Sequence, residues 1–220
     1  LRILVALNGK PGGYMTLVGK LHATMVFGRR VRVLAELLAE RVPASAHSLV
    51  DIGCGDGQVA HLIAARRPQL QITGLDVLVR PQTHIPVQAF DGTTLTLADQ
   101  SVDVAMFVDV LHHTDDPLVL LREAKRVARQ AIIIKDHCRD GFLAGPTLRF
   151  MDWVGNAHHG VVLPYNYWSE QLWRAAFAEL GLTVADWTQQ VPLYPWPASW
   201  LFQRQLHFVA RLTPSPLAAY

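Results

Sequence analysis

Cysteine is scarce in this chain, and no long apolar run occurs in it. Cys54 and Cys138 are its only cysteines among 220 residues. Two cysteines are too few for a disulfide framework and have no metal-site spacing, so we expect a reducing compartment and a cytoplasmic location. Charged residues, proline or glycine interrupt every apolar run before the roughly 18 residues that a spanning helix needs. We therefore expect no transmembrane segment.

A dense basic patch is also missing. The formal net charge is +2, and the basic residues are scattered apart from Arg29-Arg30 with Arg32 and the pair Arg66-Arg67. Proteins that bind nucleic acid usually concentrate positive charge and interleave it with aromatic residues. We expect no nucleic-acid partner and a small molecule instead, while the oligomeric state stays open.

Short apolar segments alternate with helical patterns over the first two thirds of the chain. Half of the residues are apolar and 17% are charged, which is typical of one well-buried globular domain of this length. The pattern predicts strands at 48–52, 71–76, 87–90, 102–108 and 131–135, and helices at 21–40, 58–66 and 117–128. Such alternation indicates a mainly parallel sheet covered by helices on both faces.

The last third of the chain has a different pattern. An irregular, aromatic stretch is expected after Asp140, followed by a helix at 169–180 and two final strands at 182–191 and 206–212. Ser169 is expected to cap that helix at its start, and Gly181 at its end. The connector 193–202 contains Trp196 and Trp200. It could enclose an acceptor, mediate dimerisation or rest on a membrane surface as a peripheral contact.

Three glycines connect the first predicted strand to the helix after it. Gly53, Gly55 and Gly57 alternate with other residues, which lets the backbone approach a polar ligand and adopt positive φ. The start of the helix offers free N–H groups. Asp51 precedes the glycines, and Asp76 ends the next strand, where a doubly wound fold binds ribose hydroxyls. This arrangement predicts a nucleoside-binding loop.

A dinucleotide is the competing ligand for this loop. Its fingerprint, Gly-x-Gly-x-x-Gly, ends on Gln58 when read from Gly53 and on Ala60 when read from Gly55. The second frame fits the tolerant Gly/Ala form, so spacing alone leaves a nicotinamide-dependent oxidoreductase open. Asp51 would repel a pyrophosphate but suits an ammonium group, which favours a nucleoside that carries a cationic amino acid.

The chain resembles the class I S-adenosylmethionine-dependent methyltransferases from about Leu49 to Lys135. The similarity rests on Asp51–Gly57, Gly74–Asp76, Phe90–Gly92 and the run Ser101–His113 with the Asp-Asp-Pro that follows it. As a set, these motifs are similar to the small-molecule enzymes grouped with the ubiquinone/menaquinone C-methyltransferases. The resemblance implies a Rossmann-like, seven-stranded, mostly parallel sheet with helices on both faces and an antiparallel C-terminal strand. Lys135-Asp136-His137 departs from the family, which usually has a Pro-Gly-Gly turn before this point.

The resemblance also implies a cofactor and its binding residues. S-adenosylmethionine would be the methyl donor and S-adenosylhomocysteine the product. The binding residues would lie at the methionine end (Asp51, Gly53, Cys54 and Gly55), at the ribose (Asp76), around the adenine (Val77, Asp91 and Gly92) and beside the sulfonium (Phe107 and Val108).

Two histidines, His112 and His113, are the candidate catalytic residues. They follow the fourth predicted strand, at the carboxyl-end crevice where open α/β sheets bind ligands. Either could act as a general base near neutral pH, and the alternative is a packing role in the loop. We expect no metal, because adjacent histidines rarely share one without further ligands.

The acceptor is expected to be a small organic molecule, with a lipophilic one among the options, methylated on O, C or N. Its candidate contacts are Tyr14, Trp153, His158, Tyr165 and Tyr167. We expect one methyltransferase domain over residues 1–220, divided into an N-terminal lid and helix (1–45), a cofactor-binding core (46–140), an acceptor-side segment (141–181) and C-terminal strands (182–220). A methyltransferase-like module that binds the cofactor without catalysis is the alternative from another functional class.

Overall fold

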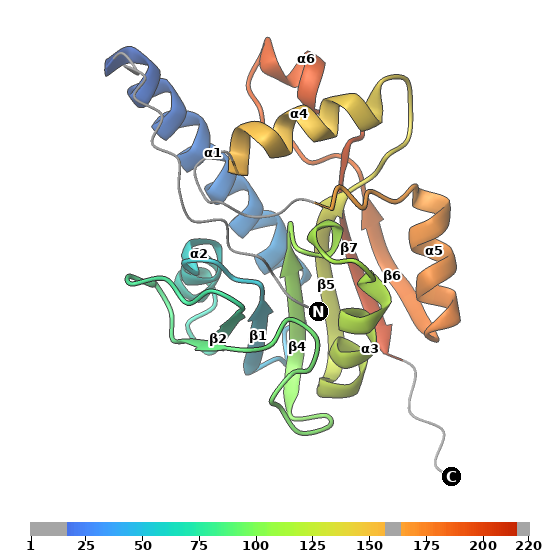
Figure 1. The fold of residues 1–220 in the computed structure, drawn as a ribbon. Helices are drawn as coiled ribbons and strands as arrows, with labels where there is room; N and C mark the ends of the chain where they lie inside the picture. Colours follow the sequence, from blue (N-terminus) through green and yellow to red (C-terminus); the bar gives the residue numbers. More distant parts are fainter. Residues whose placement is uncertain (1–16, 157–163, 215–220) are drawn as a thin grey trace.

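A computed structural model of the chain describes residues 17–156 and 164–214 (Figure 1). Seven strands in this part form one sheet in the order β3-β2-β1-β4-β5-β7-β6. They are β1 Ser48–Ile52, β2 Gln71–Asp76, β3 Val87–Ala89, β4 Val102–Val108, β5 Ala128–His137, β6 Leu182–Thr188 and β7 His207–Pro214. The pairs from β3 through β5 are parallel, and β7 is antiparallel to both of its neighbours. The predicted fold class is confirmed.

Helices cover both faces of this sheet. They are α1 Leu17–Arg41, α2 Gln58–Arg66, α3 Pro117–Val127, α4 Ala144–Asn156, α5 Glu170–Glu179 and the short α6 Ala198–Phe202, with a 3₁₀ turn, η1, at Leu111–His113. Side chains of α1 and α2 pack into one buried cluster, and those of α3 and α5 pack into another. Helices α4 and α6 lie together beyond the carboxyl end of β5 (Figure 1).

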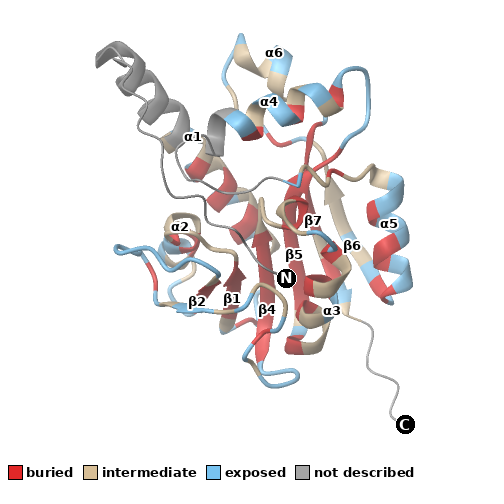
Figure 2. Cartoon of the chain, in the orientation of Figure 1, coloured by how far each residue is buried: buried red, intermediate tan, exposed pale blue. Residues whose placement is uncertain are grey.

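The central strands are buried on both faces, which explains their unbroken apolar sequences. In β5, Ile133 points into the cluster under α1 and α2, whereas Ile132 and Ile134 point into the cluster under α3 and α5. Neighbouring side chains of a strand face opposite sides of a sheet, so a strand covered twice needs apolar residues at every position. Figure 2 shows the resulting buried centre of the sheet.

Local capping sets the ends of several helices. Asp116 accepts a hydrogen bond from Leu118 N at 2.9 Å with Pro117 at the first helical position, and Ser169 accepts one from Leu172 N at 3.3 Å. Gly181 has a φ of +63°, as expected for a residue after a helix. The predicted caps of the helix that became α5 are therefore confirmed.

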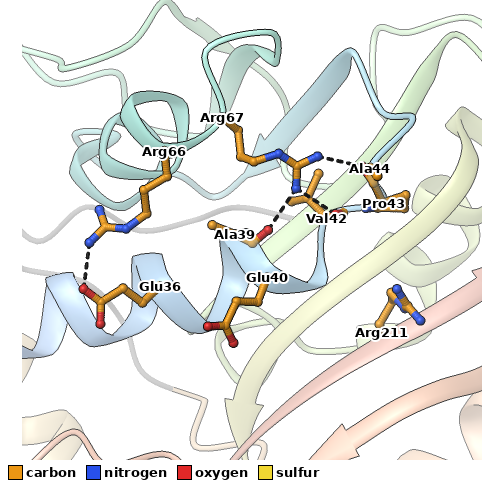
Figure 3. A pocket seen from close by; sticks show the side chains of 9 residues that line it. All are labelled: Glu36, Ala39, Glu40, Val42, Pro43, Ala44, Arg66, Arg67 and Arg211. Carbon is orange, nitrogen blue, oxygen red and sulfur yellow. Dashed lines mark hydrogen bonds and ion pairs between the residues drawn. The ribbon is translucent and has the colours of Figure 1, made fainter.

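The basic pair Arg66-Arg67 anchors the last turn of α1. Arg67 donates to the carbonyl oxygens of Ala39, Val42 and Pro43, which the end of a helix leaves without intrahelical partners (Figure 3). Arg66 pairs with Glu36 at 2.7 Å. These residues line a surface hollow of about 530 Å³ next to the amino end of β1. The glycine loop lies at the other end of this strand.

The prediction of an irregular stretch directly after Asp140 is wrong, because α4 occupies residues 144–156. Ala144, Leu148 and Met151 recur at helical spacing and pack against Tyr167. Pro146 lies in the first turn of this helix, where proline is tolerated because its missing N–H has no intrahelical partner.

Strand β5 is longer than the predicted 131–135 at both ends, and its carboxyl end, Lys135-Asp136-His137, includes two residues that the sequence placed after the strand. These polar residues continue the ladder with β7 and are buried. Smaller differences are that β3 ends at Ala89, that β6 ends at Thr188 and that the connector 193–202 contains α6.

Asp103 links the segments at the amino ends of β1, β4 and β5 by hydrogen bonds. Its carboxylate accepts hydrogen bonds from His47 N at 2.9 Å, Ser48 N at 3.0 Å, Ser48 Oγ at 3.1 Å and Gln130 Nε2 at 3.0 Å, and it pairs with Arg129 at 3.0 Å. Burial favours protonation, but these donors outweigh it and hold the pKa of Asp103 below its usual range.

We expect Asp103→Ala to lower the free energy of unfolding at pH 7 by about 1–3 kcal/mol, because buried donors lose their acceptor. A carboxylate with a lowered folded-state pKa stabilises the protein above its unfolded pKa of about 3.9, and this stabilisation is lost as the pH falls toward the folded value. Urea unfolding at pH 7 and near pH 3 should therefore show a smaller difference at the lower pH. Asp99→Ala, at an exposed position, is the matched control, and an equal effect of both variants would contradict the assignment.

Candidate functional site

The glycine loop has the backbone that the sequence predicts. Gly53, Gly55 and Gly57 have φ values of +74°, +61° and +76°. A Cβ atom at Gly53 would lie 2.6 Å from a methyl group of Val110, and one at Gly57 would lie 2.4 Å from Cγ1 of Ile85. Larger residues are excluded both by conformation and by space.

Asp51, at the end of β1, is a buried acceptor that lacks a donor. Its side chain is almost fully buried, and its Oδ1 atom has no hydrogen-bond partner within the described part of the chain. Burial, together with the negative charge of Asp76, raises the pKa of Asp51 to about 7. Buried polar atoms are rarely left unpaired in proteins. An ammonium group of a ligand would supply the missing donor and favour the ionised carboxylate.

Asp76 ends β2 beside the loop. Its Oδ2 atom accepts a hydrogen bond from Gly55 N at 2.7 Å, and its Oδ1 atom accepts one from Leu78 N at 2.9 Å. Each carboxylate oxygen has a further lone pair for a ligand hydroxyl. Val77, directly after Asp76, is 45% exposed, which leaves an apolar face beside this carboxylate. The residues present therefore fit a nucleoside that carries an amino-acid chain.

The other predicted cofactor residues have different surroundings. Asp91 is exposed and accepts hydrogen bonds from Thr93 N and Thr94 N, which lower its pKa, and Gly92 beside it has a φ of +84°. Phe107 is fully buried in the core, so its side chain is not accessible to a ligand, and Val108 is half-buried.

Cys54 packs at the junction of β1 and β2. Its Sγ atom would lie 2.4 Å from a Cβ at Gly74, so the thiol occupies the space that this glycine leaves. Burial, together with the charges of Asp51 and Asp76, raises the pKa of the Cys54 thiol above its usual range. The side chain of Cys54 therefore fills space, and its backbone belongs to the loop.

His112 lies in a buried ion-pair network at the carboxyl ends of β4 and β5. Its Nδ1 atom is 2.6 Å from Asp136 Oδ1, and its Nε2 atom is 3.4 Å from Asp152 Oδ2. Burial alone would lower the pKa of His112, but the two carboxylates outweigh it and raise this pKa to about 10. His112 is therefore an imidazolium at neutral pH.

His113 has the opposite protonation state. Burial, together with the positive charge of His112, lowers its pKa to about 4, so its imidazole is neutral at neutral pH. The two rings lie 3.9 Å apart between centroids. The Nδ1 atom of His113 is buried and has no hydrogen-bond partner among the described residues.

A second charged group adjoins this network. Lys135 has no solvent exposure and forms an ion pair with Asp109, which also accepts a hydrogen bond from Arg30 Nη2 at 2.7 Å. Burial opposes the charge of Asp109, but Lys135 and Arg30 outweigh it and hold the pKa of Asp109 well below its usual range. Asp109 also has a φ of +58°, a backbone strain that often marks functional sites.

The sequence predicts no role for Lys135 or Asp136, and for Asp152 it predicts only that this polar group orients a substrate. One signal was present, because Lys135 and Asp136 follow three isoleucines at the carboxyl end of a parallel strand, where such sheets bind ligands. The contact of Asp152 with His112 has no local signal in the sequence, because it depends on the position of α4.

The predicted acceptor residues are only partly brought together. Tyr167 is buried, donates its hydroxyl hydrogen bond to Asp152 and stacks on His112 with 5.5 Å between ring centroids. Tyr165 is half-buried beside Tyr167, whereas Trp153 is 61% exposed and faces away from the network. Tyr14 and His158 lie outside the described residues.

The histidine network also contains potential metal ligands. Two sets of three residues, His112 with Asp136 and His137, and His112 with His113 and Asp152, have ligand atoms within 4.8 Å of one another. His112 is already paired with both carboxylates, so we assign these contacts to ion pairing. The absence of a metal stays a prediction.

The contrast between the two histidines is directly measurable. We expect the imidazole of His112 to stay protonated up to about pH 10 and that of His113 to stay neutral down to about pH 4. Nitrogen NMR of the side chains measures both, with signals assigned through His112→Gln and His113→Gln. Asp136→Asn should lower the pKa of His112, because burial remains while a countercharge is lost. Asp115→Asn, at an exposed carboxylate nearby, is the control. Titration of His112 between pH 6 and 7 in the unsubstituted protein would contradict the network.

Known proteins match this chain in sequence and in fold. A methyltransferase domain family model matches residues 26–186, well over half of the chain. Trans-aconitate 2-methyltransferase of Methylobacterium radiotolerans is 35% identical over 130 residues, which is 56% of this chain and 49% of that protein. The enzyme of the same name from Delftia acidovorans is 44% identical over 75 residues, 32% of this chain and 26% of that protein. The matched regions thus span half or less of these relatives.

Solved structures share the fold at low sequence identity. A geranyl diphosphate methyltransferase in complex with S-adenosylmethionine has a TM-score of 0.68 at 14% identity, covering 94% of this chain and 93% of that one. A putative methyltransferase bound to the Trm112 activator of Haloferax volcanii has a TM-score of 0.64 at 19% identity, covering 89% and 96%.

The family match decides between the two ligands that the glycine spacing left open. It confirms the resemblance to the class I enzymes, and S-adenosylmethionine is the methyl donor of this family. Helices long and apolar enough to cross a membrane were not found among the described residues. The chain belongs to the methyltransferase domain family.

Proposed function

We propose that the protein transfers the methyl group of S-adenosylmethionine to a carboxylate oxygen of a small organic acid, giving a methyl ester and S-adenosylhomocysteine. One observation carries this proposal. The pKa values of His112, about 10, and His113, about 4, both lie outside the range of an efficient general base at neutral pH. A carboxylate needs no base, because it is already ionised, whereas a phenol or a carbon acid must lose a proton.

The donor side of the proposal rests on three residues. Asp51 would accept from the ammonium group, Asp76 would accept from the ribose hydroxyls, and Val77 would pack on the adenine. When bound, the cofactor supplies a methyl group activated by a positively charged sulfur. The glycine loop would hold it at the carboxyl edge of the sheet, next to η1 and its histidines.

The change in charge during the reaction favours transfer of a methyl group from a sulfonium to a carboxylate. The methyl carbon forms a bond to the carboxylate oxygen as its bond to sulfur breaks, and the electron pair of that bond stays on sulfur. A negative and a positive charge disappear together, and no proton is released. A site that excludes water favours such a step, because the separated charges lose their hydration. Buried Tyr167 and the ion-paired network would help to exclude water.

The histidines then have positioning and contact roles. Three cations, Arg30, Lys135 and His112, balance the three carboxylates of the network, Asp109, Asp136 and Asp152. His112 would hold η1, β5 and α4 in place, and is thus a positioning residue. His113 is half-buried and neutral, and its ring would donate a hydrogen bond to the acceptor carboxylate.

Two further observations support a small organic acid. The relatives are named for trans-aconitate, a small molecule that carries carboxylates. Arg149 of α4 lies 5.6 Å from the ring centre of Tyr165, so a cation and an aromatic face occur together. An apolar part of the acceptor would pack on Tyr165 and Tyr167, which would accommodate a lipophilic acid.

Cofactor binding tests the donor side. Asp76→Ala should weaken the affinity for S-adenosylhomocysteine by about 1–3 kcal/mol in titration calorimetry, which corresponds to about 5- to 150-fold. Asp76→Asn retains one acceptor oxygen and should have an intermediate effect. Glu179→Ala, at an exposed position of α5, is the control. Unchanged affinity in folded Asp76→Ala would remove this residue from the ribose role.

Turnover on a panel of small carboxylic acids, phenols and carbon acids tests the acceptor side, with esters identified by mass spectrometry. His113→Ala should keep carboxylate methylation within about tenfold of the unsubstituted rate, since no base is required. S-adenosylmethionine must be present at a saturating concentration, because its affinity is expected to change with pH. The pKa of Asp51 is about 7, and the ionised carboxylate binds the ammonium group of the donor more tightly than the protonated one. His61→Ala, at an exposed position of α2, is the control. Methylation confined to phenols or carbon acids, with a loss of about 10²- to 10⁴-fold in His113→Ala, would replace this proposal with base catalysis.

A further inference from the structure

The exposed aromatic residues of the described chain are concentrated in one place. Figure 2 shows exposed positions along α4, along α6 and in the loops that lead to them. We define the α4–α6 surface by its large exposed hydrophobic residues, which are Phe142, Leu143, Phe150, Trp153, Trp196, Trp200 and Leu201. The remaining large exposed hydrophobic residues in the described part are aliphatic, namely Val77, Leu78, Val79 and Leu172. The α4–α6 surface is therefore distinct in chemistry from the rest.

This surface is continuous across the two helices. The rings of Phe150 and Phe202 stack with 6.3 Å between centroids, and Arg204 Nη2 donates to Thr147 Oγ1 at 3.0 Å. Phe142, Trp196 and Trp200 are 86%, 84% and 79% exposed. Exposed apolar patches of this kind mark interaction sites in soluble proteins.

The charges of the surface indicate what covers it. In the segments 141–153 and 195–205, the exposed charged residues are Arg149 and Arg204. The acid within these segments, Asp152, is buried and turned inward to His112. The outer side of these two segments therefore combines aromatic residues with positive charge, and the exposed acid just before them, Asp140, accepts a hydrogen bond from Glu170 N at 2.7 Å.

We propose that the α4–α6 surface docks on a membrane that contains anionic lipids. Tryptophan favours the boundary between headgroups and acyl chains, because its ring is apolar and its N–H is polar. Arginine beside it is attracted to anionic headgroups. Peripheral binding of this type combines buried apolar area with electrostatic attraction. The proposal does not depend on the acceptor, although Arg149 of α4 belongs to both sides, because it is exposed on this surface and lies 5.6 Å from the ring centre of Tyr165.

Sedimentation with vesicles tests this proposal. The protein should bind vesicles of phosphatidylcholine that contain phosphatidylglycerol more tightly than vesicles of phosphatidylcholine alone, and added salt should weaken the binding. The double variant Trp196→Ser with Trp200→Ser should bind at least about tenfold more weakly, because two large apolar side chains no longer leave water. Arg149→Gln should weaken binding about fivefold, and only to the anionic vesicles.

Leu172→Ser removes an exposed apolar residue from α5 and is the matched control, with no expected change. Quenching of the tryptophan fluorescence of the unsubstituted protein by brominated lipids gives a measurement that needs no variant. No vesicle binding, no quenching, or an equal loss in Leu172→Ser would overturn the proposal. Sedimentation velocity tests the alternative that a second copy of the chain packs on the α4–α6 surface. A dimer that the tryptophan double variant dissociates, without vesicle binding by the unsubstituted protein, would also overturn it.

Discussion

Lys135 has no solvent exposure, and its charge is paired with the carboxylate of Asp109, which also pairs with Arg30. Lys135 lies in β5, Asp109 follows β4, and Arg30 comes from α1, so one ion-paired group joins two strands to a helix. Removing Asp109 would leave the buried charge of Lys135 without compensation, which is strongly destabilising. The second network, of His112 with Asp136 and Asp152, begins one residue along β5 and connects η1 to α4. Paired charges thus stabilise the structure at the carboxyl ends of the strands, whereas apolar contacts stabilise the packing of helices on the two faces of the sheet.

The sequence predicts best those features that depend on a few neighbouring residues. The bounds of β1, β2, β4 and α2 agree with the prediction residue for residue, because apolar runs, glycines and prolines delimit them locally. The positive φ values at Gly53 and Gly55 follow from the same local pattern. Helix α4 and the polar end of β5 differ from the prediction, because contacts with elements distant in sequence, Tyr167 for α4 and β7 for β5, stabilise them.

The protonation states of the two histidines could not be predicted from the sequence, for a different reason. His112 and His113 are adjacent and chemically identical, yet their pKa values lie on opposite sides of neutrality. The difference arises from Asp136, 24 residues away in sequence, and from Asp152 on a helix that the sequence did not reveal. The residue type and its place after a strand were enough to predict either histidine as a candidate base. The protonation state of each histidine depends on neighbours that only the tertiary fold brings close. These two pKa values support the proposed transfer to an acceptor that is already ionised.

The packing of Cys54 over Gly74 has a practical consequence for chemistry on this protein. Thiol reagents attack the thiolate, and its fraction falls as the pKa rises. Burial raises the pKa of the Cys54 thiol, and burial also raises that of Cys138 to about 12. Both natural cysteines should therefore react slowly with alkylating probes, so a single cysteine introduced on an exposed helix would take up a fluorophore or spin label selectively without first removing either.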